Sequence, residues 1–280
     1  MSRGLDVYTA LWSMQPHDRS GVKLPYEEVV EKVADAGYRG MALDFGANTR
    51  DEIERILPMM ARAGLRPFLV DFPKTIEGLR PTLRLAKAHG APFVVVIGQV
   101  MPVTVEGMIP VIRAWIAMSE EEGMPVLFET HRNCITNDLY ATLQLLDAVP
   151  EMRMCADLSH YVVGREMTLP IPQRELDHIS RILARSDSFQ GRVAGRQQVQ
   201  LQLDFPQNAK WVDLFRGWWR EGFASWRARN PEGDCIFLCE LGPPDYAITG
   251  PDGREMSDRW QEALQIKAWV EEIWAELEAA

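Results

Sequence analysis

The chain has 280 residues, of which 46% are hydrophobic and 25% charged, a balance unlike that of a disordered or fibrous protein. Its 30 lysines and arginines against 40 aspartates and glutamates give a formal charge of −10, which repels nucleic-acid backbones and anionic membrane surfaces. The first residues lack the apolar core of a signal peptide, and no later apolar run is long enough to cross a bilayer. We therefore expect a cytoplasmic protein that binds neither nucleic acid nor membranes.

Short apolar runs alternate with longer amphipathic stretches along the whole chain. The first two amphipathic stretches, residues 25–37 and 51–64, each close on a glycine, as helix C-termini commonly do. Eight of the apolar runs are typical of strands, and the seventh is the shortest of them and contains an arginine. In chain order they are residues 5–12, 40–46, 66–72, 92–98, 125–131, 152–158, 191–195 and 235–242.

Eight strand–helix pairs predict an α/β fold, a single (β/α)8 TIM barrel of parallel strands. The strand runs are almost continuously apolar, which fits a sheet covered by helices. An open, doubly wound sheet is the structural alternative, although it would leave edge strands and does not require eight of them. No linker or change of composition divides the chain, so we expect one domain over residues 1–280.

Cysteine and tryptophan are both expected to serve packing. The cysteines are too few and too irregularly spaced for a disulfide framework, which predicts reduced core residues; they are Cys134, Cys155, Cys235 and Cys239. Most tryptophans fall in the last two amphipathic stretches, where helical spacing favours a buried shell, with an oligomer contact in a dimer or tetramer as the alternative. These are Trp211, Trp218, Trp219, Trp226, Trp260, Trp269 and Trp274.

Three of the predicted strands carry an acidic residue near their carboxyl ends, where TIM barrels carry their active sites. Because alternate strand residues share a face, Glu129 is expected on the same face as Leu127, Asp157 with Cys155, and Glu240 with Leu238. Each acid alone could be a loop cap or an ion-pair partner. Three together would repel one another unless a cation lay between them, so their coincidence predicts a metal site.

Further polar residues follow the strands, and for each of them a purely structural role is the alternative. Gln190 could supply a fourth ligand through its amide oxygen, with Arg192 or Arg196 next to it, or it could belong to a solvated loop. His160 could hydrogen-bond a substrate oxygen or pack the loop, and His131 and Arg132 have the same two options. Three other residues near the strand ends, with no role beyond substrate contact, are Asp44, Asp71 and His17.

The order of these motifs resembles the xylose isomerase-like TIM-barrel superfamily, and most closely its sugar isomerase/epimerase branch. The matching motifs are Glu129 at the end of strand five, D-x-x-H (157–160) at strand six, a polar residue and then an arginine around strand seven, and Glu240 at strand eight. The resemblance implies Glu129, Asp157, Gln190 and Glu240 as metal ligands, and Glu129 and Glu240 as acid/base groups. It also implies substrate contacts from His160 and Arg196, with His131 as a further candidate. Epimerases of this branch usually have His where this chain has Gln190.

An all-oxygen ligand set favours Mn²⁺ or Mg²⁺, with Co²⁺ or Zn²⁺ as alternatives. The expected function is isomerisation or epimerisation of a sugar or small hydroxy-carbonyl substrate, in which carboxylates transfer a proton by way of a metal-stabilised enediolate. A lyase or dehydratase on the same site and a non-catalytic barrel that binds a polar ligand are the alternatives. An abasic-site endonuclease is disfavoured by the five histidines and the negative charge.

Overall fold

The computed structural model describes residues 3–16 and 21–279, so His17 lies outside the described residues. Eight parallel strands pair in sequence order, and β8 pairs with β1 to close the barrel. They are β1 (Arg3–Ala10), β2 (Gly40–Asp44), β3 (Arg66–Asp71), β4 (Val94–Val96), β5 (Val126–Glu129), β6 (Met154–Ala156), β7 (Ser186–Gly191) and β8 (Gly233–Cys239). The predicted (β/α)8 barrel is confirmed, and the open sheet is excluded because the barrel has no edge strand.

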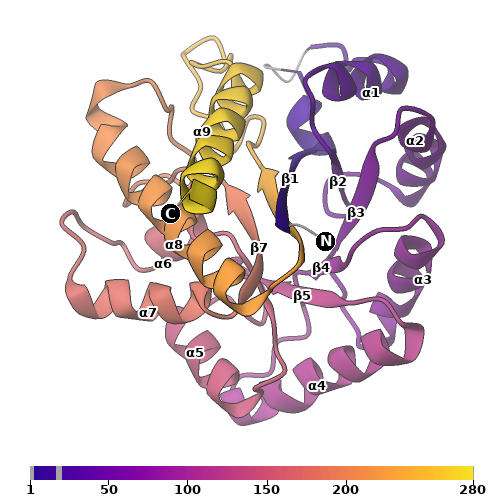
Figure 1. Cartoon of the computed structure of the whole chain (residues 1–280), viewed down its shortest axis with the longest axis vertical. Coiled ribbons are helices and arrows are strands. Elements are labelled where there is room, and N and C mark those ends of the chain that lie inside the picture. The colour runs from indigo at the N-terminus through magenta and orange to yellow at the C-terminus, as the bar shows by residue number, and fades with distance from the viewer. Residues whose placement is uncertain (1–2, 17–20, 280) are drawn as a thin grey trace.

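Helices surround the central strands as an outer layer (Figure 1). The α-helices are α1 (Tyr26–Asp35), α2 (Arg50–Arg62), α3 (Arg80–Ala88), α4 (Val105–Glu122), α5 (Leu139–Ala148), α6 (Ser159–Gly164), α7 (Gln173–Leu183), α8 (Ala209–Arg229) and α9 (Arg259–Ala279); short 3₁₀ helices span Leu11–Met14, Glu77–Leu79 and Pro206–Asn208. Helices α8 and α9 lie side by side, drawn in orange and yellow. Four of their tryptophans are buried, as a packed shell requires, namely Trp218, Trp219, Trp226 and Trp274.

Local sequence signals set the bounds of α2. Thr49 caps its first turn by accepting a hydrogen bond from the Glu52 amide, while the Glu52 side chain accepts one from the Thr49 amide. Just beyond its last turn, Gly64 has a φ of +73°, a left-handed conformation that glycine adopts without steric cost. The buried face of α2 consists of Ile53, Ile56, Leu57 and Met60. Helix 51–64 was thus predictable from caps and periodicity together.

Two apolar layers enclose the sheet, because successive strand residues point to opposite faces. The larger layer lies between the strands and the helices. The smaller one fills the barrel interior, and it includes Leu127 on β5, Cys155 on β6 and Leu238 on β8. All four cysteines are buried and free, as predicted for reduced core residues. Among the described residues, no helix is both long enough and apolar enough to cross a membrane.

The prediction for the seventh strand was wrong by about five residues, since β7 spans Ser186–Gly191 rather than 191–195. Its sequence, SDSFQG, carries few apolar side chains, and three polar residues on one face are buried instead: Ser186, Ser188 and Gln190. The Ser188 hydroxyl donates a hydrogen bond to the Ile236 carbonyl, which satisfies it inside the protein. Apolar patterning misses a strand whose buried face is polar but hydrogen-bonded.

Glycine 40 permits close packing between β1, β2 and β3. A Cβ atom there would lie 1.9 Å from the Arg66 carbonyl oxygen and 2.4 Å from the Tyr8 ring. We expect Gly40→Ala to lower the free energy of unfolding by more than about 3 kcal/mol, because backbone atoms would have to move. The matched control is Gly217→Ala, on the exposed face of α8 with nothing within 4 Å of the added Cβ, which should raise stability by about 0.5–1 kcal/mol. Chemical denaturation followed by circular dichroism measures both, and equal effects would contradict this account.

Candidate active site

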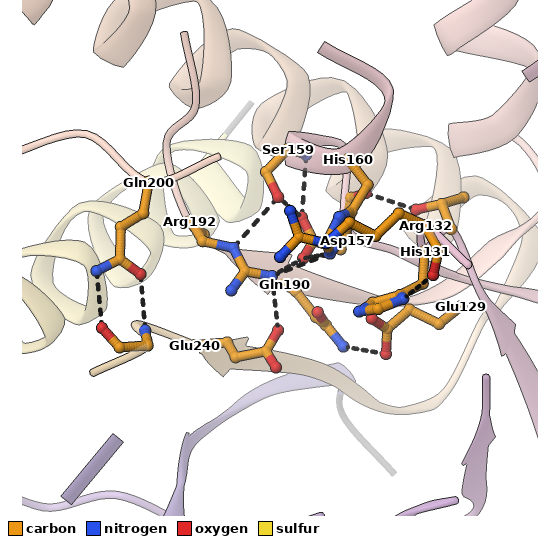
Figure 2. Close-up of polar contacts among 12 residues, drawn as sticks. Glu129, His131, Arg132, Asp157, Ser159, His160, Gln190, Arg192, Gln200 and Glu240 are labelled. Atoms are coloured by element: carbon orange, nitrogen blue, oxygen red, sulfur yellow. Dashed lines mark hydrogen bonds and ion pairs between the residues drawn. The ribbon is translucent and has the colours of Figure 1, made fainter. Parts of the chain in front are cut away.

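Three carboxylates meet at the carboxyl end of the barrel. Glu129 ends β5, Asp157 follows β6 and Glu240 follows β8, each two residues beyond a member of the inner apolar layer. All three are buried, and each offers one oxygen such that the three oxygens lie within 4.8 Å of one another. Figure 2 shows Arg192 beside Asp157 and Glu240, and Glu129 linked to Gln190. Strand alternation therefore predicted which acids share this pocket.

Gln190 joins the carboxylates from β7. Its Nε2 donates a hydrogen bond to Glu129 Oε2 at 2.8 Å, and its Oε1 is buried without a hydrogen-bond partner among the described residues. A buried amide oxygen without a partner is unfavourable by about 1–3 kcal/mol. This oxygen is free to bind a cation or a substrate hydroxyl. The structure thus places Gln190 in the pocket, although the seventh strand was predicted too late in the sequence.

Among the described residues, Arg192 is the one cationic side chain that is buried next to these acids. Its side chain is 1% exposed, and its guanidinium forms an ion pair with Asp157 and a longer contact of 3.5 Å to Glu240. Its Nε donates to the Ser159 hydroxyl at 3.2 Å, and the guanidinium carbon lies 4.8 Å from the centre of the Tyr246 ring. The sequence pattern alone defines no role for Arg192. Its spacing of two from Gln190 is the signal that could have placed it on the same face.

Arg196, by contrast, lies outside the pocket. Its side chain is 52% exposed and pairs with Glu166 at 3.1 Å on the surface. Arg132 lies at the mouth of the barrel, where its guanidinium is 4.9 Å from the Tyr246 ring centre. The arginine that the structure brings to the carboxylates is therefore Arg192, and the substrate contact that the resemblance implies for Arg196 has no support in this geometry.

Burial and mutual repulsion control the protonation of the acids. Burial, with the charges of Glu240 and Asp157, raises the pKa of Glu129 well above its usual range. Burial also raises the pKa of Glu240 to about 8, although Arg192 partly opposes it. Burial acts on Asp157 too, but Arg192, His160 and Ser159 stabilise its anion and lower its pKa to about 2. The pocket therefore has too little positive charge of its own to ionise every acid near neutral pH.

Two histidines lie beside Glu129. The ring centres of His131 and His160 are 4.1 Å apart, and Glu129, His131 and His160 each offer a ligand atom such that the three atoms lie within 4.8 Å of one another. Burial lowers the pKa of His131 to about 4, so its ring is neutral at pH 7, and burial also lowers the pKa of His160 well below its usual value. Neutral imidazoles can accept hydrogen bonds or bind metal ions.

The oxygen donors fit a divalent cation. With all groups ionised, Glu129, Asp157 and Glu240 together with Arg192 carry a formal charge of −2, which one divalent ion would balance. The unpartnered Oε1 of Gln190 would supply a fourth, neutral ligand. Asp157 already accepts hydrogen bonds from Ser159 and Arg192, so a cation would share this carboxylate with Arg192. The four residues named by the resemblance are thus compatible with a metal site.

The loop after β7 packs against the loop after β8 and so supports Glu240. The buried side chain of Gln200 donates to the Gly242 carbonyl at 3.0 Å and accepts from the Gly242 amide at 2.7 Å, as Figure 2 shows. These two bonds fix the backbone two residues beyond Glu240. On the far side of the loop, Glu262 of α9 accepts a hydrogen bond from the Leu203 amide at 2.8 Å.

Comparison with known proteins places the chain in a family. The sequence pattern of the xylose isomerase-like TIM barrel family matches residues 30–190, more than half of the chain, so the chain belongs to that family. The matched part includes Glu129, Asp157 and Gln190. No curated protein sequence matches the chain significantly.

Solved structures share the fold over nearly the whole chain. A xylose isomerase-like TIM barrel protein from Mycobacterium smegmatis, in complex with magnesium, has a TM-score of 0.65 at 12% identity and covers 98% of this chain and 97% of its own. D-allulose 3-epimerase from Methylomonas sp., in complex with D-allulose, has a TM-score of 0.58 at 13% identity, covering 97% and 99%. The probable 3-DHS dehydratase AsbF from Bacillus anthracis has a TM-score of 0.55 at 14% identity, covering 94% and 99%. At these identities the likeness shows the fold alone.

Glu262 of α9 accepts a hydrogen bond from Leu203 in the loop after β7, and its protonation makes the stability of the protein depend on pH. Burial, with the charges of Asp204 and Glu255, raises the pKa of Glu262 from 4.5 to about 7. A carboxyl group with a raised pKa in the folded state binds its proton more tightly there than in the unfolded chain. Its contribution to the free energy of unfolding is therefore present below about pH 4.5 and is lost as the pH rises to about 7.

We expect Glu262→Gln to raise the free energy of unfolding by roughly 2 kcal/mol at pH 8.5 and by much less at pH 5, because the amide carries no charge in either state. The substitution keeps an acceptor for Leu203 and a polar partner for Ser257. Glu276→Gln, on the exposed face of the same helix, is the control and should change stability by less than about 0.5 kcal/mol at either pH. Denaturation curves at both pH values decide, and a pH-independent effect of Glu262→Gln would contradict the assignment.

Proposed function

We propose that this protein is a metal-dependent isomerase or epimerase of a sugar or small hydroxy-carbonyl compound. The observation that carries the proposal is the convergence of Glu129, Asp157 and Glu240, all buried, at the carboxyl end of the barrel. Acids that are buried together are unfavourable for folding unless a ligand compensates them. Membership of the xylose isomerase-like family, and the presence of a ketose 3-epimerase among the similar structures, support the reaction class.

Glu129, Asp157, Gln190 and Glu240 would hold the cation. A divalent ion bound there would polarise a substrate carbonyl and so acidify the neighbouring C–H bond. The oxygen-only ligand set favours Mn²⁺ or Mg²⁺, with Co²⁺ or Zn²⁺ able to replace them. Asp157 accepts hydrogen bonds from the amide and hydroxyl of Ser159 and from Arg192, which suits a fixed ligand better than a proton carrier.

We assign proton transfer to Glu129 and Glu240. They extend from β5 and β8, with β6 and β7 between them, so they reach the pocket from different sides. One carboxylate would remove the proton next to the polarised carbonyl, and the other would return a proton to the neighbouring carbon or to the opposite face. Arg192, buried between Asp157 and Glu240, is the guanidinium that we propose to face the substrate in place of the exposed Arg196.

His131 and His160 line the same pocket beside Glu129, where they can contact a substrate oxygen directly or through a bound cation. A probable dehydratase is among the similar structures, which supports loss of water as the alternative reaction. Proton abstraction is common to both outcomes, so an assay of abstraction tests the site without presuming the product.

Removal of divalent ions should abolish proton abstraction. We expect the chelator-treated protein to incorporate no solvent deuterium into small ketoses or hydroxy-keto acids, and Mn²⁺ or Mg²⁺ to restore incorporation, because proton removal needs a polarised carbonyl. Nuclear magnetic resonance or mass spectrometry of the substrate pool measures the exchange and identifies isomer, epimer or dehydrated product. Exchange that persists fully without divalent ions would exclude the proposed role of the cation.

Glu240→Gln should lower the rate of deuterium exchange by at least about 100-fold, since the amide can neither accept the proton nor carry the charge of a ligand. The change is nearly isosteric, so the circular dichroism spectrum and melting temperature should stay close to those of the unchanged protein. Glu166→Gln, which removes only the surface partner of Arg196, is the control and should leave the rate unchanged. Full activity of the Glu240 variant would remove this residue from the mechanism.

A further inference from the structure

We infer that the substrate of this pocket carries a carboxylate group, which pairs with the guanidinium of Arg132 beside the Tyr246 ring, while a neighbouring substrate oxygen accepts a hydrogen bond from Arg192. The inference deepens the proposed function and rests on it for the identity of the pocket. It narrows the substrate class to hydroxy-keto acids, in preference to neutral ketoses. Two guanidinium groups on one aromatic ring, each with N–H donors to spare, carry the argument.

Tyr246 brings the two arginines together. The guanidinium carbon of Arg192 lies 4.8 Å and that of Arg132 4.9 Å from the centre of its ring. Trp12 holds this ring with its own ring centre 5.1 Å away, and the Tyr246 amide donates to the Pro243 carbonyl at 2.8 Å. An aromatic ring stabilises a guanidinium without accepting strong hydrogen bonds from it, so the N–H groups stay available for an anion.

Arg192 has a buried donor group without an acceptor. Its Nη1 is buried and has no hydrogen-bond partner among the described residues, and no dashed line reaches this nitrogen in Figure 2. The other two nitrogens are in use, with partners in Ser159, Asp157, His160 and Glu240. A buried charged donor without an acceptor is unfavourable for folding. An oxygen of a bound substrate would supply the acceptor.

Arg132 carries a positive charge that no neighbouring acid balances. Its side chain is exposed at the mouth, and within residues 3–16 and 21–279 no carboxylate forms an ion pair with it. The other buried acids at the strand ends, Asp44 and Asp71, accept hydrogen bonds from backbone amides of their own loops. A divalent ion together with Arg192 would balance the three carboxylates of the pocket, so the charge of Arg132 would be left over. A substrate carboxylate would balance it, whereas a neutral sugar would not.

The loop after β5 presents Arg132 from a fixed backbone. The Arg132 carbonyl oxygen lies 2.5 Å from Nδ1 of His131, and Cys134 Sγ donates to the His131 carbonyl at 2.8 Å. The next residue, Asn133, has a φ of 55°, a left-handed conformation that few residues other than glycine adopt. Its amide donates to Oδ1 of Asn137 at 3.1 Å. A loop that is ordered in advance loses less entropy when it binds a ligand.

The available charge favours a carboxylate over a phosphate ester. A carboxylate carries one negative charge and accepts two parallel N–H bonds from a single guanidinium. A phosphate monoester carries nearly two negative charges at neutral pH, so it needs a second cationic group. Arg192 is already paired with Asp157, which leaves Arg132 as the one charge to be matched.

The test compares sugars that share a carbon skeleton and differ in one group. D-Fructose, D-fructose 6-phosphate and D-fructuronate carry a hydroxymethyl group, a phosphate ester and a carboxylate at the same carbon. Dihydroxyacetone and hydroxypyruvate repeat the comparison of hydroxymethyl with carboxylate on a three-carbon chain. Isothermal titration calorimetry measures binding to the full-length protein loaded with Mn²⁺, and solvent deuterium exchange gives KM and kcat. We expect at least one carboxylate compound to bind about tenfold or more tightly than its neutral analogue.

Arg132→Gln should abolish this preference. For the carboxylate substrate KM should rise at least about tenfold and kcat change less than about threefold, because the contact is equally strong in the ground state and the transition state. Arg132→Lys keeps the charge but not the planar fork, and should restore part of the preference. Arg113→Gln, which removes an exposed positive charge on α4, is the control and should change none of these values. Circular dichroism and the melting temperature check that each variant is folded.

The outcomes separate this inference from the proposed function. If no carboxylate compound binds more tightly than its neutral analogue, or if Arg132→Gln leaves the preference intact, the carboxylate assignment is overturned. Metal-dependent exchange in a neutral ketose would then still support the proposed function. A preference for fructose 6-phosphate that depends on Arg132 would overturn the carboxylate in favour of a phosphate. Carboxylate binding that depends on Arg132, without metal-dependent exchange in any compound, would support the inference and count against the proposed function.

Discussion

The burial of several acidic side chains at one end of the barrel is the constraint on which the rest of the pocket depends. Glu129, Asp157 and Glu240 are each at most 8% exposed, and they lie close enough together that their oxygens approach within 4.8 Å. Arg192 neutralises Asp157 and reaches Glu240 only weakly, so protons or a bound cation must compensate the remainder. Such an arrangement is unfavourable for stability, and proteins retain it where function needs it.

A closed barrel supplies the rigidity that this constraint requires. Below the carboxylates the interior is apolar and close-packed, with Tyr8, Phe68 and Phe93 among its largest side chains. The strands end at the same level, so residues at their carboxyl ends face one another whatever their separation in sequence. Outside the strand ends, the paired hydrogen bonds of Gln200 to Gly242 hold the loop that follows Glu240. The pocket is thus supported from below by packing and from the side by backbone hydrogen bonds.

Sequence reasoning was most successful where one physical rule fixes the answer. Strand alternation placed Glu129 with Leu127 and Glu240 with Leu238 on the inner face, and eight alternating units predicted the closed barrel. It failed at β7, since a strand with buried serines has no apolar signature. The role of Arg192 was also missed. An arginine is unfavourable to bury, so it is expected at the surface unless its buried carboxylate partners are already known. The resemblance to the family implied a role for Arg196, but the side chain of Arg196 is exposed at the surface.

The histidines show why ligand identity cannot be deduced from motif order alone. His160 follows Asp157 by three residues in sequence, yet its chemistry is set by contacts from other elements, including Arg192 after β7 and the facing ring of His131 after β5. The Arg192 guanidinium, which can only donate, lies 3.3 Å from His160 Nε2, so that ring nitrogen accepts and the hydrogen is on Nδ1. Arg192, which compensates the buried charge of Asp157, thereby also determines which nitrogen of the His160 ring carries the hydrogen. The acids, the arginine and the histidines of this pocket must therefore be treated as one coupled system.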